Sequence, residues 1–542
     1  MQPSSYWLTR IIGGCLSAAL LFVPTIFPTQ DLKAQSKASS ITLQELRDHI
    51  FFLASDSLGG RRPDDIGYVI AARYAADQLK AAGVKPIIKD AGGNDTYFQT
   101  VPLVKAKTVV DIPLTIKTAD GEKSFEVLQD LKLQARGPSL TDVPVVFVGY
   151  GISEPGHGWN DLQNVDIKGK IVVLLMGAPS RDGKRILPDS LHSAYQSNAG
   201  SRKKVLESPF FRQNMPAAVL VVPDEEQTAR WNMLPDVLSS LQIMLISNNQ
   251  AVNIPTGPAM VGLIKGALVE TLFKHQKYSP VGIGRKELEG YQSFELVGVR
   301  VSFGLKTIGE DFESMNVVGM VPGTDPAVSG EYVTLGAHLD HVKPLNGQVC
   351  NGADDDASGS VGILEIAEAI AQQPPRRSVV FSLYTAEESG LLGSRFFVAN
   401  CPIPVKNITV NLNLDMIGRS DSSARQSRKH YVIGSDKTNP ELRRLIDSVN
   451  SVTVKWPLDF ESEDRSMAGS DHMSFHKEGI PVAFFFSGRH EDLHLPTDDT
   501  ENIDFEKMQK LTQLVYEVTV EIGNQRPSLR SVGQGGGTSL QK

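Results

Sequence analysis

The chain has few cysteines, no concentrated basic stretch and, past its first residues, no long hydrophobic run. Only three of its 542 residues are cysteines, so a fold held by several disulfides is excluded. Cys350 and Cys401, the two beyond the N-terminal segment, are open either to pairing or to remaining free thiols. The formal net charge is -8 and no dense basic stripe is present, which argues against nucleic acid as a partner.

The one long apolar run lies at the N-terminus. Arg10 is followed by mostly apolar residues up to Phe27, the pattern of a secretory signal peptide. Small residues place cleavage near Ala34, so residues 1–34 are predicted to be removed and the protein to be secreted or periplasmic. The alternative is an uncleaved membrane anchor, which Pro24 and Pro28 disfavour. No stable membrane span is therefore expected after cleavage.

The length exceeds one ordinary core, and the two halves of the chain have different patterns. From residue 332 onward, apolar strands alternate with amphipathic helices, which predicts an α/β fold with helices on both faces of the central sheet. Short strands with long polar connections occupy about residues 138–282, and they predict a β-rich module inserted between 35–137 and 283–525. The low-complexity stretch 526–542 is predicted to be a disordered tail.

Histidines and carboxylates follow several of the predicted strands in the second half. They are His338, Asp340, Asp355, Glu387, Glu388, Asp415 and His494. Ligands of open α/β sheets bind beyond the carboxyl ends of strands. Imidazole nitrogen and carboxylate oxygen are ligands that zinc accepts. Taken together and in this order, the residues predict a two-metal site and a zinc-dependent peptidase.

The residue types also indicate separate roles within such a site. Asp355, in an aspartate-rich loop, is the best candidate to bridge two ions, because a carboxylate has two oxygens. Of the adjacent Glu387 and Glu388, one can bind metal while the other takes a proton from the metal-activated water. Asp340 can accept the hydrogen bond from the imidazole N–H of His338 that the metal leaves free.

Each motif taken alone also fits an ordinary strand end, a solvated glutamate pair or a turn. The other histidines of this half are expected to contact ligands or to lie on the surface; they are His341, His472, His476 and His490.

With these motifs the chain resembles the co-catalytic di-zinc exopeptidases, which include leucyl-type aminopeptidases and glutamate carboxypeptidases. The stretches 352–359 and 385–394 carry the resemblance most specifically, and 470–472 with 494–498 match the family's closing motifs. Residues 148–151 and 166–172 look like the protease-associated (PA) domain that many members carry as an insertion, and residues 56–62 match a recurrent early loop.

The resemblance implies a role for each residue. Two Zn²⁺ are expected, one completed by His338 and Asp415 and the other by Glu388 and His494. Asp355 would bridge them, Glu387 would be the general base, and the Asp355–Asp356 peptide would be cis. Peptides are the expected substrates.

One departure concerns Leu493, where many relatives have a tyrosine whose hydroxyl steadies the oxyanion. Leucine cannot donate a hydrogen bond, so substrate specificity cannot be carried over from those relatives. The leading hypothesis is an aminopeptidase. A carboxypeptidase or dipeptidase of the same fold, a single-zinc aminoacyl cyclase and a receptor-like binding module are the alternatives. The full set of ligands and the base argues against the receptor-like module.

Overall fold

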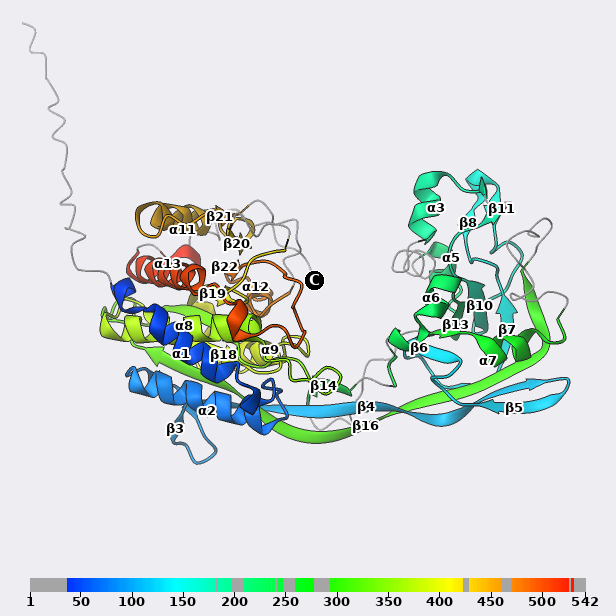
Figure 1. Cartoon of the computed structure of the whole chain (residues 1–542), viewed down its shortest axis with the longest axis horizontal. Helices are drawn as coiled ribbons and strands as arrows, with labels where there is room; N and C mark the ends of the chain where they lie inside the picture. Colours follow the sequence, from blue (N-terminus) through cyan, green and yellow to red (C-terminus); the bar gives the residue numbers. More distant parts are fainter. Residues whose placement is uncertain are drawn as a thin grey trace, which may run out of the picture.

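The computed structural model describes residues 37–181, 184–196, 208–234, 236–238, 241–246, 259–276, 293–422, 428–460, 469–525 and 528–530. The predicted signal peptide lies outside the described residues, as does the predicted tail apart from 528–530. Within these ranges, no helix is both long and apolar enough to cross a membrane. Figure 1 shows two lobes joined by a pair of long strands.

The first lobe, with a core drawn from residues 41–84 and 317–529, is built on a mixed sheet. Its strand order is β21-β20-β22-β19-β17-β18-β16. The bounds are β16 (Phe294–Val321), β17 (Tyr332–His338), β18 (Ser378–Tyr384), β19 (Ile408–Leu414), β20 (His430–Ile433), β21 (Leu458–Asp459) and β22 (Val482–Phe486). Neighbours among β18, β17, β19 and β22 run parallel, whereas β16 and β20 pair antiparallel.

Helices cover both faces of this sheet, as the sequence predicts. Along β18, Val379 and Phe381 face one hydrophobic cluster while Val380 and Tyr384 face another. This alternation buries every residue of β18. The first cluster includes residues of α1 (Leu43–Leu53), α2 (Ile66–Ala81), α8 (Gly359–Gln372), α11 (Pro440–Val452) and α13 (Phe505–Asn524). The second includes residues of α9 (Leu392–Ala399) and α12 (His472–His476), and α10 (Ser435–Thr438) precedes α11.

The start of α1 shows how local sequence sets a helix boundary. Thr42 caps the helix, because its hydroxyl accepts a hydrogen bond from the backbone N–H of Glu45 at 3.2 Å. The same hydroxyl donates a hydrogen bond to the Glu45 carboxylate at 2.7 Å. Such a cap stabilises a helix by about 1 kcal/mol.

The second lobe has its own cores, drawn from residues 114–303. Four strands run parallel there: β7 (Leu140–Phe147), β10 (Ile171–Leu175), β13 (Ala218–Val222) and β15 (Met260–Ile264), with β6 (Leu131–Ala135) antiparallel at the edge. Along β10, Val173 faces one core and Val172 the other. The lobe also contains α3 (Asp189–Gln196), α5 (Pro209–Gln213), α6 (Glu225–Ala229) and α7 (Gly266–Phe273). The sequence predicts the strands of this lobe but not its helices. The hydrophobic cores of the lobe extend past both ends of the predicted 138–282 module.

A two-stranded ribbon connects the lobes (Figure 1). β4 (Phe98–Thr118) pairs antiparallel with β16 from Phe98 opposite Val317 to Lys117 opposite Arg300. Because β16 pairs with β18 in one lobe and with β7 in the other, hydrogen bonding runs continuously between the two sheets. The sequence does not predict this continuous pairing between the two lobes.

Shorter strands complete the fold. β5 (Gly121–Phe125) and β14 (Leu241–Leu245) pair with β4. The others are β1 (Lys85–Pro86), β2 (Ile88–Lys89), β3 (Asp95–Thr96), β8 (Ser153–Glu154), β9 (Trp159–Asn160), β11 (Ser180–Arg181) and β12 (Lys184–Arg185).

Candidate metal centre

The predicted site residues meet at one edge of the first-lobe sheet. His338 is the last residue of β17, Asp415 directly follows β19, and Glu387 and Glu388 follow β18 by three and four residues. The carboxyl ends of these parallel strands point to the same edge, so their following residues come together. Asp355 reaches the same place from the segment before α8. His494 reaches it from the loop after β22.

Asp355 lies between two histidines. Its Oδ1 is 3.3 Å from Nε2 of His338, and its Oδ2 is 3.1 Å from Nε2 of His494. The Nε2 of His338 also lies 3.5 Å from Oδ1 of Asp415. The Nε2 of His494 lies 3.1 Å from Oε2 of Glu388. The structure therefore brings together all five predicted ligands, in two groups that share Asp355.

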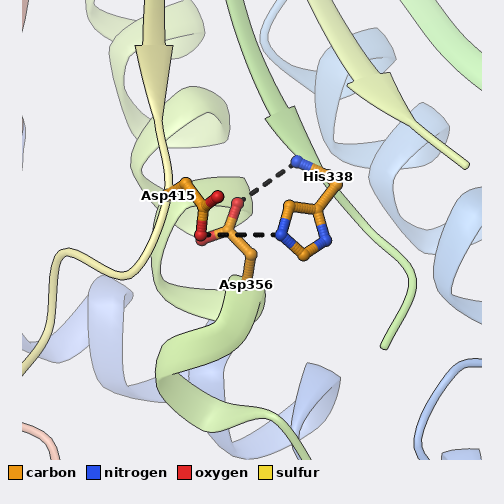
Figure 2. A group of neighbouring side chains, drawn as sticks. All are labelled: His338, Asp356 and Asp415. Atoms are coloured by element: carbon orange, nitrogen blue, oxygen red, sulfur yellow. Dashed lines mark hydrogen bonds and ion pairs between the residues drawn. The ribbon is translucent and has the colours of Figure 1, made fainter. Parts of the chain in front are cut away.

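Asp356, although next in sequence, has a different environment (Figure 2). Its carboxylate accepts backbone hydrogen bonds from His338 at 3.2 Å, Gly359 at 2.9 Å and Met416 at 3.1 Å. It thereby ties the end of β17 to the start of α8 and to the end of β19. The peptide between Asp355 and Asp356 is cis, which confirms the expectation from the resemblance. Asp356 is thus a structural carboxylate, while Asp355 faces the histidines.

His341 contacts two of the predicted ligands, which is one of the two expectations that the sequence gives for it. It is buried, and its Nδ1 lies 3.1 Å from Oε1 of Glu388 and 3.6 Å from Oδ2 of Asp355. It therefore contacts the same two carboxylates as His494, but from the interior. His494 instead lines the pocket, with about half of its side chain exposed. In the sequence, only its place directly after Asp340 indicates that His341 lies near the site.

The oxygen of Asp340 that faces His338 is not the predicted one. The Nδ1 of His338 lies 3.0 Å from the backbone carbonyl oxygen of Asp340, whereas the Asp340 carboxylate oxygen is 4.0 Å away. That carboxylate accepts a hydrogen bond from the backbone N–H of Glu387 at 3.0 Å. The imidazole is therefore oriented by a carbonyl, and the carboxylate positions the glutamate. Burial raises the pKa of Asp340 to about 7.

Glu387 lines the pocket, and its Oε2 is 4.0 Å from Nε2 of His338. Burial raises the pKa of its carboxyl well above the ordinary value, although the charge of His338 opposes the shift. A carboxylate that lines the pocket beside the ligand cluster can serve as a general base.

The electrostatics of the ligand cluster fit a bound cation. Hydrogen bonds to Asp355 and Glu388 raise the pKa of His494 to about 10. Oδ1 of Asp415 and Oε1 of Glu388 are buried and face imidazole nitrogens, those of His338 at 3.5 Å and of His341 at 3.1 Å. Buried carboxylates normally carry partners, and a metal ion is one that they accept. Two histidines and three carboxylates match the nitrogen and oxygen donors that zinc takes.

A pocket of about 680 Å³ opens onto the ligand cluster. Apolar side chains form much of its wall; they are Leu391, Met416, Ile433, Phe484, Phe486 and Leu493. The rings of Phe484 and Phe486 stack at 5.3 Å between centroids. Arg489 lines the same pocket and is exposed. An apolar cavity with a polar, charged floor is the usual form of a small-molecule or peptide site.

Known peptidases are similar in sequence to the part of the chain that contains the site. A sequence model of peptidase family M28 matches residues 316–519, the stretch that contains all the predicted ligands. Probable leucine aminopeptidase 1 of Trichophyton verrucosum is 27% identical over 269 residues, which are 46% of this chain and 70% of that protein. Leucine aminopeptidase 1 of Trichophyton rubrum is 29% identical over 226 residues, 39% of this chain. That alignment spans only 59% of the Trichophyton rubrum protein's length.

Among solved structures, BSAP, a zinc aminopeptidase from Bacillus subtilis, aligns with 88% of this chain and 94% of its own. The sequence identity is 19% and the TM-score 0.47. The part of this chain that assembles the ligand cluster is thus similar in sequence to peptidase family M28.

Proposed function

We propose that this protein is a zinc-dependent aminopeptidase that removes N-terminal residues from peptides. One observation carries the proposal: the two oxygens of Asp355 face two different histidines at the floor of an apolar pocket. The match to peptidase family M28 and the names of the similar fungal proteins support peptide hydrolysis as the reaction.

Two zinc ions are proposed, because the donors form two groups around one shared carboxylate. His338 and Asp415 would hold one ion, Glu388 and His494 the other, and Asp355 both. Bound zinc supplies a Lewis acid that polarises the peptide carbonyl and lowers the pKa of water.

Glu387 is proposed as the general base. It lines the pocket without taking part in the ligand contacts of Asp355, and the hydrogen bond from its own backbone N–H to Asp340 fixes its position. Its carboxylate would take a proton from the attacking water and deliver it to the leaving amine.

The pocket wall indicates the kind of residue that is removed. Ile433, Phe484 and Phe486 present aliphatic and aromatic surface next to the ligands. Burying an apolar side chain there is favourable by about 25 cal/mol per Å². We therefore propose that apolar N-terminal residues are preferred over charged ones.

A carboxypeptidase or dipeptidase activity is the second candidate, because Arg489 lines the pocket. A guanidinium group pairs well with a carboxylate, which is what the C-terminus of a short peptide would offer. Arg489 is exposed, however, and it is the only arginine among the lining residues.

Export remains a proposal based on the N-terminal sequence alone. If residues 1–34 are a signal peptide, the protein acts outside the cytoplasm on extracellular or periplasmic peptides.

A substrate panel separates the two activities. We expect leucine p-nitroanilide to be hydrolysed, N-acetyl-leucine p-nitroanilide to be left intact, and aspartate p-nitroanilide to be a poor substrate. A strong chelator should abolish the activity, and added zinc should restore it. Release of C-terminal residues from N-blocked peptides, without cleavage of the free-amine substrate, would instead establish the carboxypeptidase.

Deletion of the second lobe should alter substrate selection more than metal content. Every residue that lines the pocket lies between 338 and 494, outside that lobe. Among the described residues, the groups that could hold a metal also lie outside it. Val109 and Lys306 are paired in the ribbon, so a short turn between them can replace residues 110–305. We expect zinc content to persist, with a changed KM and a wider range of peptide sizes.

This deletion also removes β14, whose Ile243 and Leu245 pack against Leu103 and Leu392. A full-length variant with Ile243→Thr and Leu245→Thr therefore serves as the control, because it weakens only that packing. Loss of zinc from a folded deletion protein, but not from the control, would make the second lobe part of the metal site.

A further inference from the structure

Arg61 is a buried arginine beneath the metal centre. It lies in the loop between the short helix Asp56–Leu58 and α2, and it has no solvent exposure. Its guanidinium donates to four backbone carbonyls, those of Leu53 at 2.6 Å, Leu339 at 2.9 Å, Asn351 at 2.6 Å and Gly352 at 3.0 Å. Each of these acceptors is a neutral group, so an ion pair does not explain the position of this side chain.

Two of these carbonyls belong to segments that carry predicted ligands. Leu339 lies between His338 and Asp340, and Gly352 lies three residues before Asp355. A single planar group thus joins the end of β17 to the loop that enters α8. The distance between His338 and Asp355 depends on how these two segments are held relative to each other.

The rest of the Arg61 loop supports the same junction. The backbone N–H of His341 donates to the carbonyl of Arg61 at 3.4 Å, and the side chain of Asn351 donates to Asp56 at 2.8 Å. A β-carbon on Gly60 would lie 2.5 Å from the carbonyl oxygen of Cys350. Arg61 itself has a φ of 58°, a conformation that a residue with a β-carbon keeps only where its surroundings enforce it.

Charge alone does not require an arginine at this place. The carboxylates that act on its charge at longer range are those of Asp356, Asp355, Asp498 and Asp340. A lysine would supply the same charge, but its single ammonium group cannot present a planar fork of donors to several carbonyls. The geometry of the four hydrogen bonds is therefore the feature specific to arginine.

We propose that Arg61 is a positioning residue of the metal centre, which fixes the spacing between His338 and Asp355 by tying their two segments together. The inference depends on the proposed zinc-binding function. Residues that orient metal ligands without touching the metal change metal affinity about 10- to 100-fold when they are replaced.

The test compares zinc affinity in folded variants. Arg61→Lys keeps the charge, and Arg61→Met removes it at similar length. Zinc affinity is measured by competition with a chromogenic chelator, and folding by circular dichroism of the metal-free protein. We expect both variants to lose about 10- to 100-fold in zinc affinity. The kcat at saturating zinc should fall, while KM changes little.

Arg377 offers a matched control, because it is also buried and donates to backbone carbonyls. It bonds the carbonyls of Ile522 and Gln525 and pairs with Glu331, at the end of β18 opposite to Glu387. Arg377→Met should lower the unfolding temperature without changing zinc affinity.

Unchanged or tighter zinc binding in folded Arg61→Lys would overturn the proposal.

If the Arg61 variants do not fold, a less disruptive variant can test the same proposal. Asp56 is exposed, and Asp56→Ala removes only its hydrogen bond with Asn351. It should weaken zinc binding in the same direction by a smaller factor, and unchanged affinity there would count against the proposal. Failure of the wild-type protein to bind zinc would refute the proposed function itself.

Discussion

Replacement of Glu387 by glutamine should abolish nearly all turnover while the protein keeps its metal. The amide keeps the size of the side chain but cannot take a proton, and loss of a general base costs about 10²- to 10⁴-fold in rate. The Glu387 side chain lies in the pocket outside the two groups that share Asp355, so ligand contacts should persist. The measurements are kcat on leucine p-nitroanilide and zinc content by elemental analysis.

The adjacent Glu388 provides the control for this substitution. Its Oε2 lies 3.1 Å from Nε2 of His494, so Glu388→Gln should lower zinc content as well as activity. Comparison of Glu387→Gln with Glu388→Gln should then distinguish a loss of proton transfer from a loss of metal binding. Near-normal turnover in Glu387→Gln with full zinc content would remove Glu387 from the proposed mechanism.

The sequence predicts much of the first lobe because its strands are short and buried on both faces. Residues 332–338, 378–384 and 408–414 form continuous or alternating apolar runs, and each run ends at a residue of the site or within three residues of one. In a parallel sheet such ends must meet at one edge. The proximity of His338 and Asp415 can therefore be predicted from the apolar runs and from the rule that the carboxyl ends of parallel strands lie at one edge of the sheet.

The long ribbon is not predictable from the same kind of pattern. β16 has 28 residues, whereas an average strand has about five or six. It passes through the cores of both lobes and is exposed between them, so no single period of buried residues describes it. The limits of the second-lobe core fall within this strand and within β4.

Side-chain partners inside the site also lie beyond sequence reasoning. Whether His338 meets the carboxylate or the carbonyl of Asp340 depends on the backbone turn after β17, which spacing does not define. Similarly, spacing does not define the 3.1 Å contact between Nδ1 of His341 and Oε1 of Glu388. Residue types predict the donors, but the fold decides which atoms meet.

Replacement of Asp355 by alanine should empty both zinc sites, since its two oxygens face His338 and His494 separately. His338→Ala should mainly weaken one site, because Glu388 and His494 still face each other. Loss of an orienting residue alone lowers metal affinity about 10- to 100-fold, so loss of a shared ligand should exceed that at both sites. Zinc titration with a competing chelator measures the two stoichiometries, and activity should fall below detection.

Asp356→Ala distinguishes loss of a ligand from loss of structure at the neighbouring position. Three backbone N–H groups bond the Asp356 carboxylate, and leaving them unpaired should cost about 1–3 kcal/mol each. This variant should therefore unfold at lower denaturant concentration, whereas Asp355→Ala should lose zinc without a comparable loss of metal-free stability. If Asp355→Ala retained one tightly bound zinc ion while His338→Ala lost both, the shared ligand would not be Asp355, and the arrangement of the two groups would have to be reassigned.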